Sequence, residues 1–293
     1  MDKKFYAAIV GATFCMGSSF IASKILLKTI PPFSLVGMRF FVAAIATLPI
    51  IWLTKQDWRY ISKADWTKIA IIGLLQTAGT MGLLFLSMLY ISASAAAVLL
   101  FTNPLWVAAL SPVFLKEKID IQQVIGLVAG IIGVSLLIGF KPDALELKGN
   151  LLGLASALCW SAATIFAKRS RLNVPPFILS GGQMFVGSLI LLSMVFVFQE
   201  PLPSVASFLA MTGDFSTWFW FLWLALPSSV GSFGLWYVAL ARGGALKASS
   251  FLFLTPVFTV ILSVLILKTS ISVPQLVGAT LVCLALYIVN RKK

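Results

Sequence analysis

Ten long apolar segments follow one another along the chain, and short stretches that hold most of the charged residues separate them. A helix needs about 20 mostly apolar residues to cross the ~30 Å hydrocarbon core of a bilayer. These segments lack the alternation of barrel strands, and a helix satisfies its own backbone in lipid, so the pattern predicts ten transmembrane helices. The predicted spans are residues 5–27, 32–54, 67–90, 93–115, 120–140, 149–170, 176–198, 215–241, 245–267 and 273–290.

The composition agrees with an all-α polytopic membrane protein. Of 293 residues, 60% are hydrophobic and 11% are charged, with a mean hydropathy of +1.01, whereas a soluble domain has about 25% charged residues. The first apolar run is longer than the roughly 7 to 15 residues of a signal-peptide core, so we expect the first helix to be retained. Three cysteines fall within apolar spans, and we interpret them as packing residues.

The basic residues indicate the orientation of the chain. The net charge is +13, and sixteen of the 22 Lys and Arg residues fall in segments that are cytoplasmic if the N-terminus is cytoplasmic. This excess has the sign of the positive-inside rule, so the charge reports topology and not a nucleic-acid partner. We therefore expect a multi-pass protein of the cell membrane with both termini in the cytoplasm.

The chain contains an internal repeat. Residues 15–42 (CMGSSFIASKILLKTIPPFSLVGMRFFV) align without a gap with residues 159–186 (CWSAATIFAKRSRLNVPPFILSGGQMFV), and ten of twenty-eight positions are identical. Residues 80–126 also match residues 232–278. The sequence therefore predicts two five-helix halves, residues 1–145 and 146–293. Because five is odd, the second half enters the membrane from the opposite side, an arrangement typical of secondary transporters.

Two motifs resemble a known family. A lysine near the end of the first helix is followed by Pro-Pro-Phe, and the fourth helix reads LLFTNPLWVAALSPVFLKEKI. Together with the two five-helix units, these motifs are similar to the EamA family of the drug/metabolite transporter superfamily. The resemblance implies a ten-helix exporter of amino acids, metabolites or small drugs. The sequence departs from the pattern where Glu117 of the first half becomes Thr269 in the second, and where the first helix lacks any acid.

Prolines near the centres of the fourth and ninth helices mark a candidate cavity wall. Pro104 and Pro256 have no N–H to donate, so they free a carbonyl one turn earlier and favour a kink. The alternative is that each proline only bends a packed helix, which transmembrane helices tolerate. The neighbouring Asn103 is polar at the expected midplane, and such groups usually face the protein interior.

Arg39 is the charged residue placed deepest in a predicted span. It lies seven residues after Pro32, about 10 Å along a helix, where an arginine costs about 2.5–3.5 kcal/mol in lipid. A polar cavity would remove that cost, so we predict contact with an anionic group of a substrate; the alternative is that Arg39 binds helix-end carbonyls. Its repeat mate Gln183 is a further candidate for substrate contact. Lys24 and its mate Lys168 lie nearer the interfaces, and for this pair we favour topology or gating.

The remaining candidates are polar or aromatic residues within spans. Gln76, Trp160, Trp236 and Tyr237 could contact a planar or cationic substrate, and the alternative for each is packing. The glycine-rich run GLVAGIIGVSLLIG in the fifth span predicts a helix-packing surface.

The leading hypothesis is a secondary transporter that exports amino acids or similar metabolites by alternating access, as a uniporter or with a proton that uses water or the substrate. All nine acids lie in loops or at span ends and the chain has no histidine, which disfavours carboxylate-based antiport and strongly cationic substrates. Three alternatives remain: an exporter of cationic or quaternary-amine compounds that uses the aromatic residues, a channel, and an intramembrane enzyme. An enzyme would need paired carboxylates, a metal cluster or an activated nucleophile. We therefore expect a small-molecule substrate, a lipid environment and no cofactor, metal or enzyme activity. The oligomeric state stays open, and a monomer is compatible with the pattern.

Overall fold

The described part of the chain folds into ten membrane-spanning helices, as the hydropathy pattern predicts. The computed structural model describes residues 2–91, 93–138, 146–198, 215–268 and 270–291, and this part of the chain contains helices and no strands. Ten helical segments within it are long and apolar enough to cross a bilayer. Their ends lie within a few residues of the predicted ones. The six simple spans are α1 (Lys3–Leu26), α2 (Pro32–Leu53), α7 (Ile121–Ile138), α8 (Leu147–Arg169), α9 (Pro176–Val197) and α15 (Val273–Asn290).

The other four spans are each built from two helices with an irregular join. The third span is α3 (Lys63–Ile72), the π-helix η1 (Gly73–Gly79) and α4 (Thr80–Ser87). The eighth is α11 (Phe215–Ala225), the π-helix η2 (Leu226–Gly231) and α12 (Ser232–Gly243). The fourth is α5 (Ala93–Leu100) and α6 (Asn103–Phe114), and the ninth is α13 (Ala245–Ser250), the 3-10 turn η3 (Phe251–Phe253) and α14 (Leu254–Leu267).

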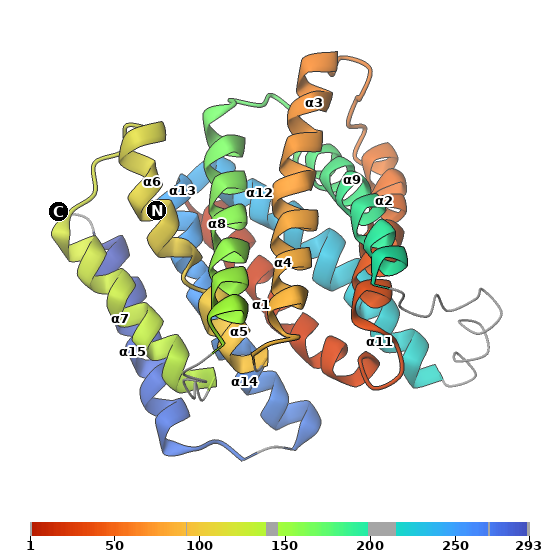
Figure 1. The fold of residues 1–293 in the computed structure, drawn as a ribbon. Coiled ribbons are helices and arrows are strands. Elements are labelled where there is room, and N and C mark those ends of the chain that lie inside the picture. The colour runs from red at the N-terminus through yellow and green to blue at the C-terminus, as the bar shows by residue number, and fades with distance from the viewer. Residues whose placement is uncertain (1, 92, 139–145, 199–214, 269, 292–293) are drawn as a thin grey trace.

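The main helix contacts join the two halves of the chain. α2 packs along α9, and α7 packs along α15 at one side of the molecule (Figure 1). In the first half α1 contacts α12 and α14, and in the second half the equivalent helix α8 contacts α4, α5 and α6. These contacts exchange when the halves are exchanged, as expected of two intertwined repeats. The N and C marks lie near each other at the left of the view in Figure 1.

The repeated Pro-Pro-Phe block starts a helix in each half. Pro31 and Pro175 are the N-cap residues of α2 and α9, with φ of -59° and -55°, and Pro32 and Pro176 take the first helical position. Proline suits this position because the first N–H groups of a helix have no intrahelical partner. The block that reveals the repeat therefore sets where α2 and α9 begin.

Four helix ends carry a cation in the left-handed backbone region. Lys55, Lys116, Arg171 and Lys268 have positive φ values of 51°, 57°, 45° and 56° and follow α2, α6, α8 and α14. Glycine usually fills this position because it carries no Cβ. A cation instead interacts favourably with the partial negative charge at the helix C-terminus.

Glycines allow α7 and α15 to pack closely. A Cβ on Gly278 of α15 would lie 2.5 Å from the Gly133 carbonyl oxygen and 2.7 Å from the Leu137 nitrogen of α7. Those neighbours are backbone atoms, which cannot move without shifting the helix. The predicted packing role of the glycine-rich fifth span is therefore confirmed.

We expect Gly278→Ala to lower the thermal stability of the purified protein. The added methyl group would push α15 away from α7, and overpacking of this kind costs about 1–3 kcal/mol. Thermal unfolding in detergent measures the effect. Gly82→Ala is the matched control, because a Cβ there meets only Leu191 Cδ2 at 3.7 Å. An unchanged Gly278→Ala midpoint would contradict the prediction.

The fourth and ninth spans are interrupted where the sequence places their prolines. We expected Pro104 and Pro256 at helix centres, but the structure puts each in the first turn of a new helix, α6 or α14, directly after the join. A proline in a first turn forfeits no helical hydrogen bond, so a break replaces the expected kink.

The two π-helices occupy equivalent positions in the two halves. With the same alignment that pairs residues 80–126 with 232–278, Leu74 and Gly79 of η1 correspond to Leu226 and Gly231 of η2. A π-helix widens the turn and is frequent at functional sites. The sequence analysis did not predict these segments.

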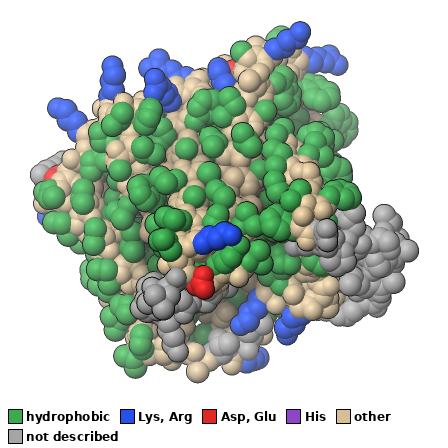
Figure 2. Space-filling view, viewed as in Figure 1, with side chains coloured by type: hydrophobic (Ala, Val, Ile, Leu, Met, Phe, Trp, Pro, Cys, Tyr) green, Lys and Arg blue, Asp and Glu red, His purple; other side chains and the backbone are tan. Residues whose placement is uncertain are grey.

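The surface matches a membrane-embedded molecule. Apolar side chains cover most of the face drawn in Figure 2, and most of the Lys and Arg side chains on this face lie along its upper edge or towards its lower end. This distribution suits a hydrocarbon belt between two aqueous surfaces.

Candidate functional site

All seven residues that the sequence nominates for substrate contact are buried, and each has a side-chain atom without a hydrogen-bond partner among the described residues. Leaving a buried polar group unpaired costs about 1–3 kcal/mol, so natural proteins contain few of them. These atoms therefore provide unused binding capacity inside the bundle. They are Arg39 Nε, Gln76 Oε1, Asn103 Oδ1, Trp160 Nε1, Gln183 Nε2, Trp236 Nε1 and Tyr237 Oη.

Two tryptophans of the second half, on different helices, meet in the interior. The ring centroids of Trp160 on α8 and Trp236 on α12 are 6.2 Å apart with an interplanar angle of 65°. Trp160 is 5% exposed and Trp236 is fully buried. Edge-to-face contact of this kind is favourable, and it leaves both indole N–H groups available to a ligand.

An aromatic contact links this pair to Arg39. The guanidinium carbon of Arg39 lies 4.4 Å from the ring centroid of the adjacent Phe40. The Phe40 ring in turn contacts Phe233 of α12 with centroids 5.7 Å apart, and Phe233 precedes Trp236 by one helical turn. Arg39, Phe40 and Phe233 therefore form a run of contacting side chains from α2 to the α12 turn that precedes Trp236.

Arg39 carries an uncompensated charge. Its side chain is only 7% exposed. The ion pairs found among the described residues, Lys68–Asp65 and Arg242–Asp2, do not include Arg39. Burial of a charge without a partner costs several kcal/mol. An anionic group of a ligand would recover that cost.

Gln183, the repeat mate of Arg39, is held by the π-helix η1. Its Oε1 accepts a hydrogen bond from Thr77 Oγ1, which leaves Nε2 as an unpaired donor. Gly73 permits this approach, since a Cβ there would lie 2.6 Å from the Gln183 carbonyl oxygen. Gln76 belongs to η1, which packs against α9. Two of the nominated residues, Gln76 and Gln183, therefore lie on the two elements of this contact.

In the other half, η2 joins α1 and α11 through serines. Ser228, the equivalent of Gln76, has its Oγ 3.1 Å from Ser18 Oγ, and Ser18 Oγ also accepts a hydrogen bond from Trp223 Nε1 at 3.0 Å. These hydroxyls are paired with one another. The two π-helices therefore carry different chemistry, an unpaired amide oxygen in η1 and satisfied hydroxyls in η2.

Asn103 forms the start of α6 and points at α8. Its Nδ2 donates to Ser161 Oγ at 2.9 Å and to the Ala157 carbonyl at 3.5 Å, so Oδ1 is left without a partner. Thr255, its repeat mate at the start of α14, is also buried with an unpaired Oγ1. The sequence analysis did not nominate Thr255, although the repeat alignment pairs it with Asn103.

Lys24 and Lys168 behave differently despite their equivalent positions. Lys24 is exposed, whereas Lys168 is partly buried and its Nζ donates to the Leu240 and Ala241 carbonyls of α12 at 3.2 and 3.3 Å. Their assignment to gating stays a prediction. Neither residue belongs to the interior group around the tryptophans.

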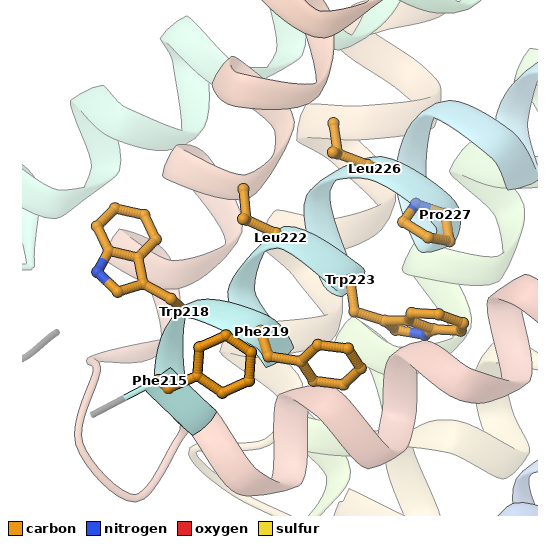
Figure 3. Close-up of a pocket in the computed structure, with 7 residues that line it drawn as sticks. All are labelled: Phe215, Trp218, Phe219, Leu222, Trp223, Leu226 and Pro227. Atoms are coloured by element: carbon orange, nitrogen blue, oxygen red, sulfur yellow. The ribbon is translucent and has the colours of Figure 1, made fainter.

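A groove on α11 does not share this chemistry. Its volume is about 300 Å³, and apolar and aromatic side chains line it, with Phe219 and Trp223 stacked at 6.0 Å (Figure 3). Trp223 directs its N–H to Ser18 of α1. The groove therefore suits lipid chains better than a polar ligand.

Metal chemistry finds no support in the described residues. Among them, no group of three His, Cys, Asp or Glu side chains lies close enough to hold a metal ion. The buried polar groups are amides, indoles, hydroxyls and one guanidinium. Such groups bind ligands by hydrogen bonds.

Comparison with known proteins shows the family to which the chain belongs. The profile of the EamA-like transporter family matches residues 3–139 and 147–291. The chain belongs to the EamA-like transporter family. It is therefore a multi-pass membrane transporter and not an enzyme, and the resemblance seen in the sequence is confirmed.

Relatives in this family span almost the same length. The uncharacterized transporter YoaV of Bacillus subtilis (strain 168) is 27% identical over 97% of this chain and 96% of its own. A probable amino-acid metabolite efflux pump of Salmonella typhimurium (strain LT2) is 26% identical over 93% of this chain and 90% of its own. A crystal structure of a protein with 18% identity superposes with a TM-score of 0.83 over 99% of this chain and 97% of the other, which shows the fold.

Proposed function

We propose that this EamA-like transporter exports small zwitterionic metabolites such as amino acids by alternating access around the buried polar residues. The observation that carries the proposal is the set of unpaired atoms inside the bundle. Four N–H donors, on Arg39, Trp160, Gln183 and Trp236, suit a carboxylate, and the amide oxygens of Gln76 and Asn103 suit an ammonium. The Salmonella relative is named as an amino-acid metabolite efflux pump, which agrees with this substrate class.

The exchange symmetry of the helix contacts supports the mechanism. Two inverted five-helix repeats, residues 1–145 and 146–293, would give inward-open and outward-open states of similar energy. The joins within the third, fourth, eighth and ninth spans supply the places at which helices could bend. In this arrangement both termini are cytoplasmic and the protein resides in the cell membrane.

Counterflow in proteoliposomes tests the proposal. Vesicles that contain the protein and are loaded with an unlabelled amino acid are expected to accumulate the same amino acid in labelled form. Loaded vesicles without the protein are not expected to accumulate it. A panel of the common amino acids, with choline and tetraethylammonium as cationic probes, separates zwitterions from quaternary amines. Accumulation of the cations alone would overturn the proposed substrate class, and single-channel conductance would indicate a channel.

Transport is also expected to be independent of pH between about pH 5 and pH 8, the range in which an unperturbed histidine titrates. The chain has no histidine, and none of the six acids in the described ranges is buried. A zwitterionic amino acid keeps its charge state across most of that range. Counterflow at several pH values, with equal pH on both sides, measures this. A steep pH dependence would indicate a proton-coupled step instead of uniport.

A further inference from the structure

A cavity lies where the C-terminal ends of α8 and α12 meet the N-terminal end of α9. Its volume is about 330 Å³, within the usual range for small-molecule sites. The polar side chains in its lining are Lys168, Arg171 and Tyr237, and the rest of the lining is apolar, including Leu172, Leu179 and Leu240. We call this the α8–α12 cavity.

The α8–α12 cavity extends from the protein surface to a buried phenol. Arg171 is exposed in the turn after α8, whereas Tyr237 is only 4% exposed. The Tyr237 hydroxyl is fully buried and has no hydrogen-bond partner among the described residues. Tyr237 follows Trp236 directly on α12, although neither tryptophan is part of the cavity lining.

The charges of the α8–α12 cavity are all positive. Lys168 and Arg171 line it and no acid does. Two of the three Lys168 N–H groups are used by the Leu240 and Ala241 carbonyls, which holds the ammonium at the wall with one donor left. Arg171 presents a planar fork that matches a carboxylate. The Tyr237 hydroxyl adds a donor at the inner end.

We propose that the α8–α12 cavity is an entry site for apolar monocarboxylates. The carboxylate binds between Arg171, Lys168 and the Tyr237 hydroxyl, and the hydrocarbon body contacts the leucines. An α-ammonium contributes nothing here, because the cavity offers it no anion and two cations repel it. That this cavity binds monocarboxylates does not depend on the proposed transport. Only its role as the first site that a substrate meets, before the interior, rests on the proposed function.

Three probes of the same carbon skeleton isolate the groups that matter. Leucine carries a carboxylate and an ammonium, 4-methylpentanoate lacks the ammonium, and 4-methylpentanamide lacks the charge as well. Isothermal titration of the full-length protein in nanodiscs is expected to give a Kd for 4-methylpentanoate at least as low as that for leucine. The amide is expected to bind about tenfold or more weakly, since hydrogen bonds to charged groups are the strong ones.

Two variants and a matched control locate the binding. Arg171→Gln is expected to raise the Kd of 4-methylpentanoate about tenfold or more, and Tyr237→Phe about fivefold, as for a charge-assisted and a weaker hydrogen bond. Arg169→Gln removes a neighbouring cation that stacks on Phe114, 5.6 Å from its ring centroid, and is outside the cavity lining. It is expected to leave the Kd unchanged.

Equal binding of the acid and the amide would overturn the entry site, and so would equal weakening by Arg169→Gln and Arg171→Gln. The counterflow assay keeps this inference separate from the proposed function. If 4-methylpentanoate binds with the expected pattern but amino acids are not transported, the transport proposal fails and the site stands. If amino acids are transported without this binding pattern, the entry site fails.

Discussion

An Arg39→Met variant is expected to lose amino-acid counterflow and to unfold at a higher temperature than the unchanged protein. Arg39 is buried without an ion-pair partner among the described residues, so the empty protein bears the cost of its charge. Methionine keeps much of the volume without the charge, and replacing a buried charge by an apolar side chain stabilises proteins by about 1–4 kcal/mol in favourable cases. Counterflow and thermal unfolding in detergent measure the two effects.

The direction in which the unfolding temperature changes separates the two interpretations of Arg39. If Arg39 only braces helix-end carbonyls, Arg39→Met removes a stabilising contact and the unfolding temperature falls. Arg39→Lys is the control, because it keeps the charge but not the fork geometry, and it is expected to retain the low stability with weaker transport. A destabilised but fully active Arg39→Met protein would contradict substrate contact.

Trp236→Ala is expected to cost about 3–5 kcal/mol of stability, the usual range for removing a buried tryptophan. Trp236 is fully buried, and its ring contacts Trp160 of α8 within the second half of the chain. The cavity left behind would remove that contact and loosen α12 against α8. Unfolding in increasing denaturant, followed by circular dichroism, measures the loss.

Trp236→Phe separates packing from ligand binding. Phenylalanine keeps an aromatic ring but removes the Nε1–H group, which has no partner in the described residues. Because no internal hydrogen bond is lost, most of the stability is expected to remain while the affinity for a transported amino acid falls severalfold. Unchanged affinity in Trp236→Phe would remove Nε1 from the proposed site.

Hydropathy predicted the spans accurately because each span satisfies a single local requirement, enough apolar length to cross the bilayer. The helix starts at Pro32 and Pro176 also follow from local chemistry, since proline suits a first turn. Alignment of the repeat then predicted which helices of the two halves correspond to one another. These features need only residues close in sequence or the comparison of one half with the other.

The π-helices escaped prediction because they change the turn and not the hydropathy. Gly73 and Gly79 bound a segment as apolar as its neighbours, and the approach of Gln183 to η1 depends on α9, more than a hundred residues later. The matched glycines Gly79 and Gly231 were the available signal. Helix breaks at Pro104 and Pro256 were located correctly, but sequence alone does not distinguish a kink from a new helix.

The sequence predicted the individual residues of the candidate site but not the contacts among them. Polarity within an apolar span nominated Arg39, Gln76 and Asn103, since buried polar groups have few other reasons to be there. Their pairing states depend on side chains from other helices, such as Thr77 beside Gln183 and Ser161 beside Asn103. The α8–α12 cavity likewise combines Arg171 with Tyr237, which are distant in the chain.

The cations at the four left-handed helix ends affect how the protein can be engineered. Glycine at Lys55, Lys116 or Arg171 would relieve backbone strain of up to about 1–2 kcal/mol. The same change would delete charges that retain short loops on one side of the bilayer during insertion. Variants selected for yield as folded protein in detergent would therefore be prone to reversed or mixed insertion during biosynthesis, and screening for heat resistance alone would favour the wrong sequences.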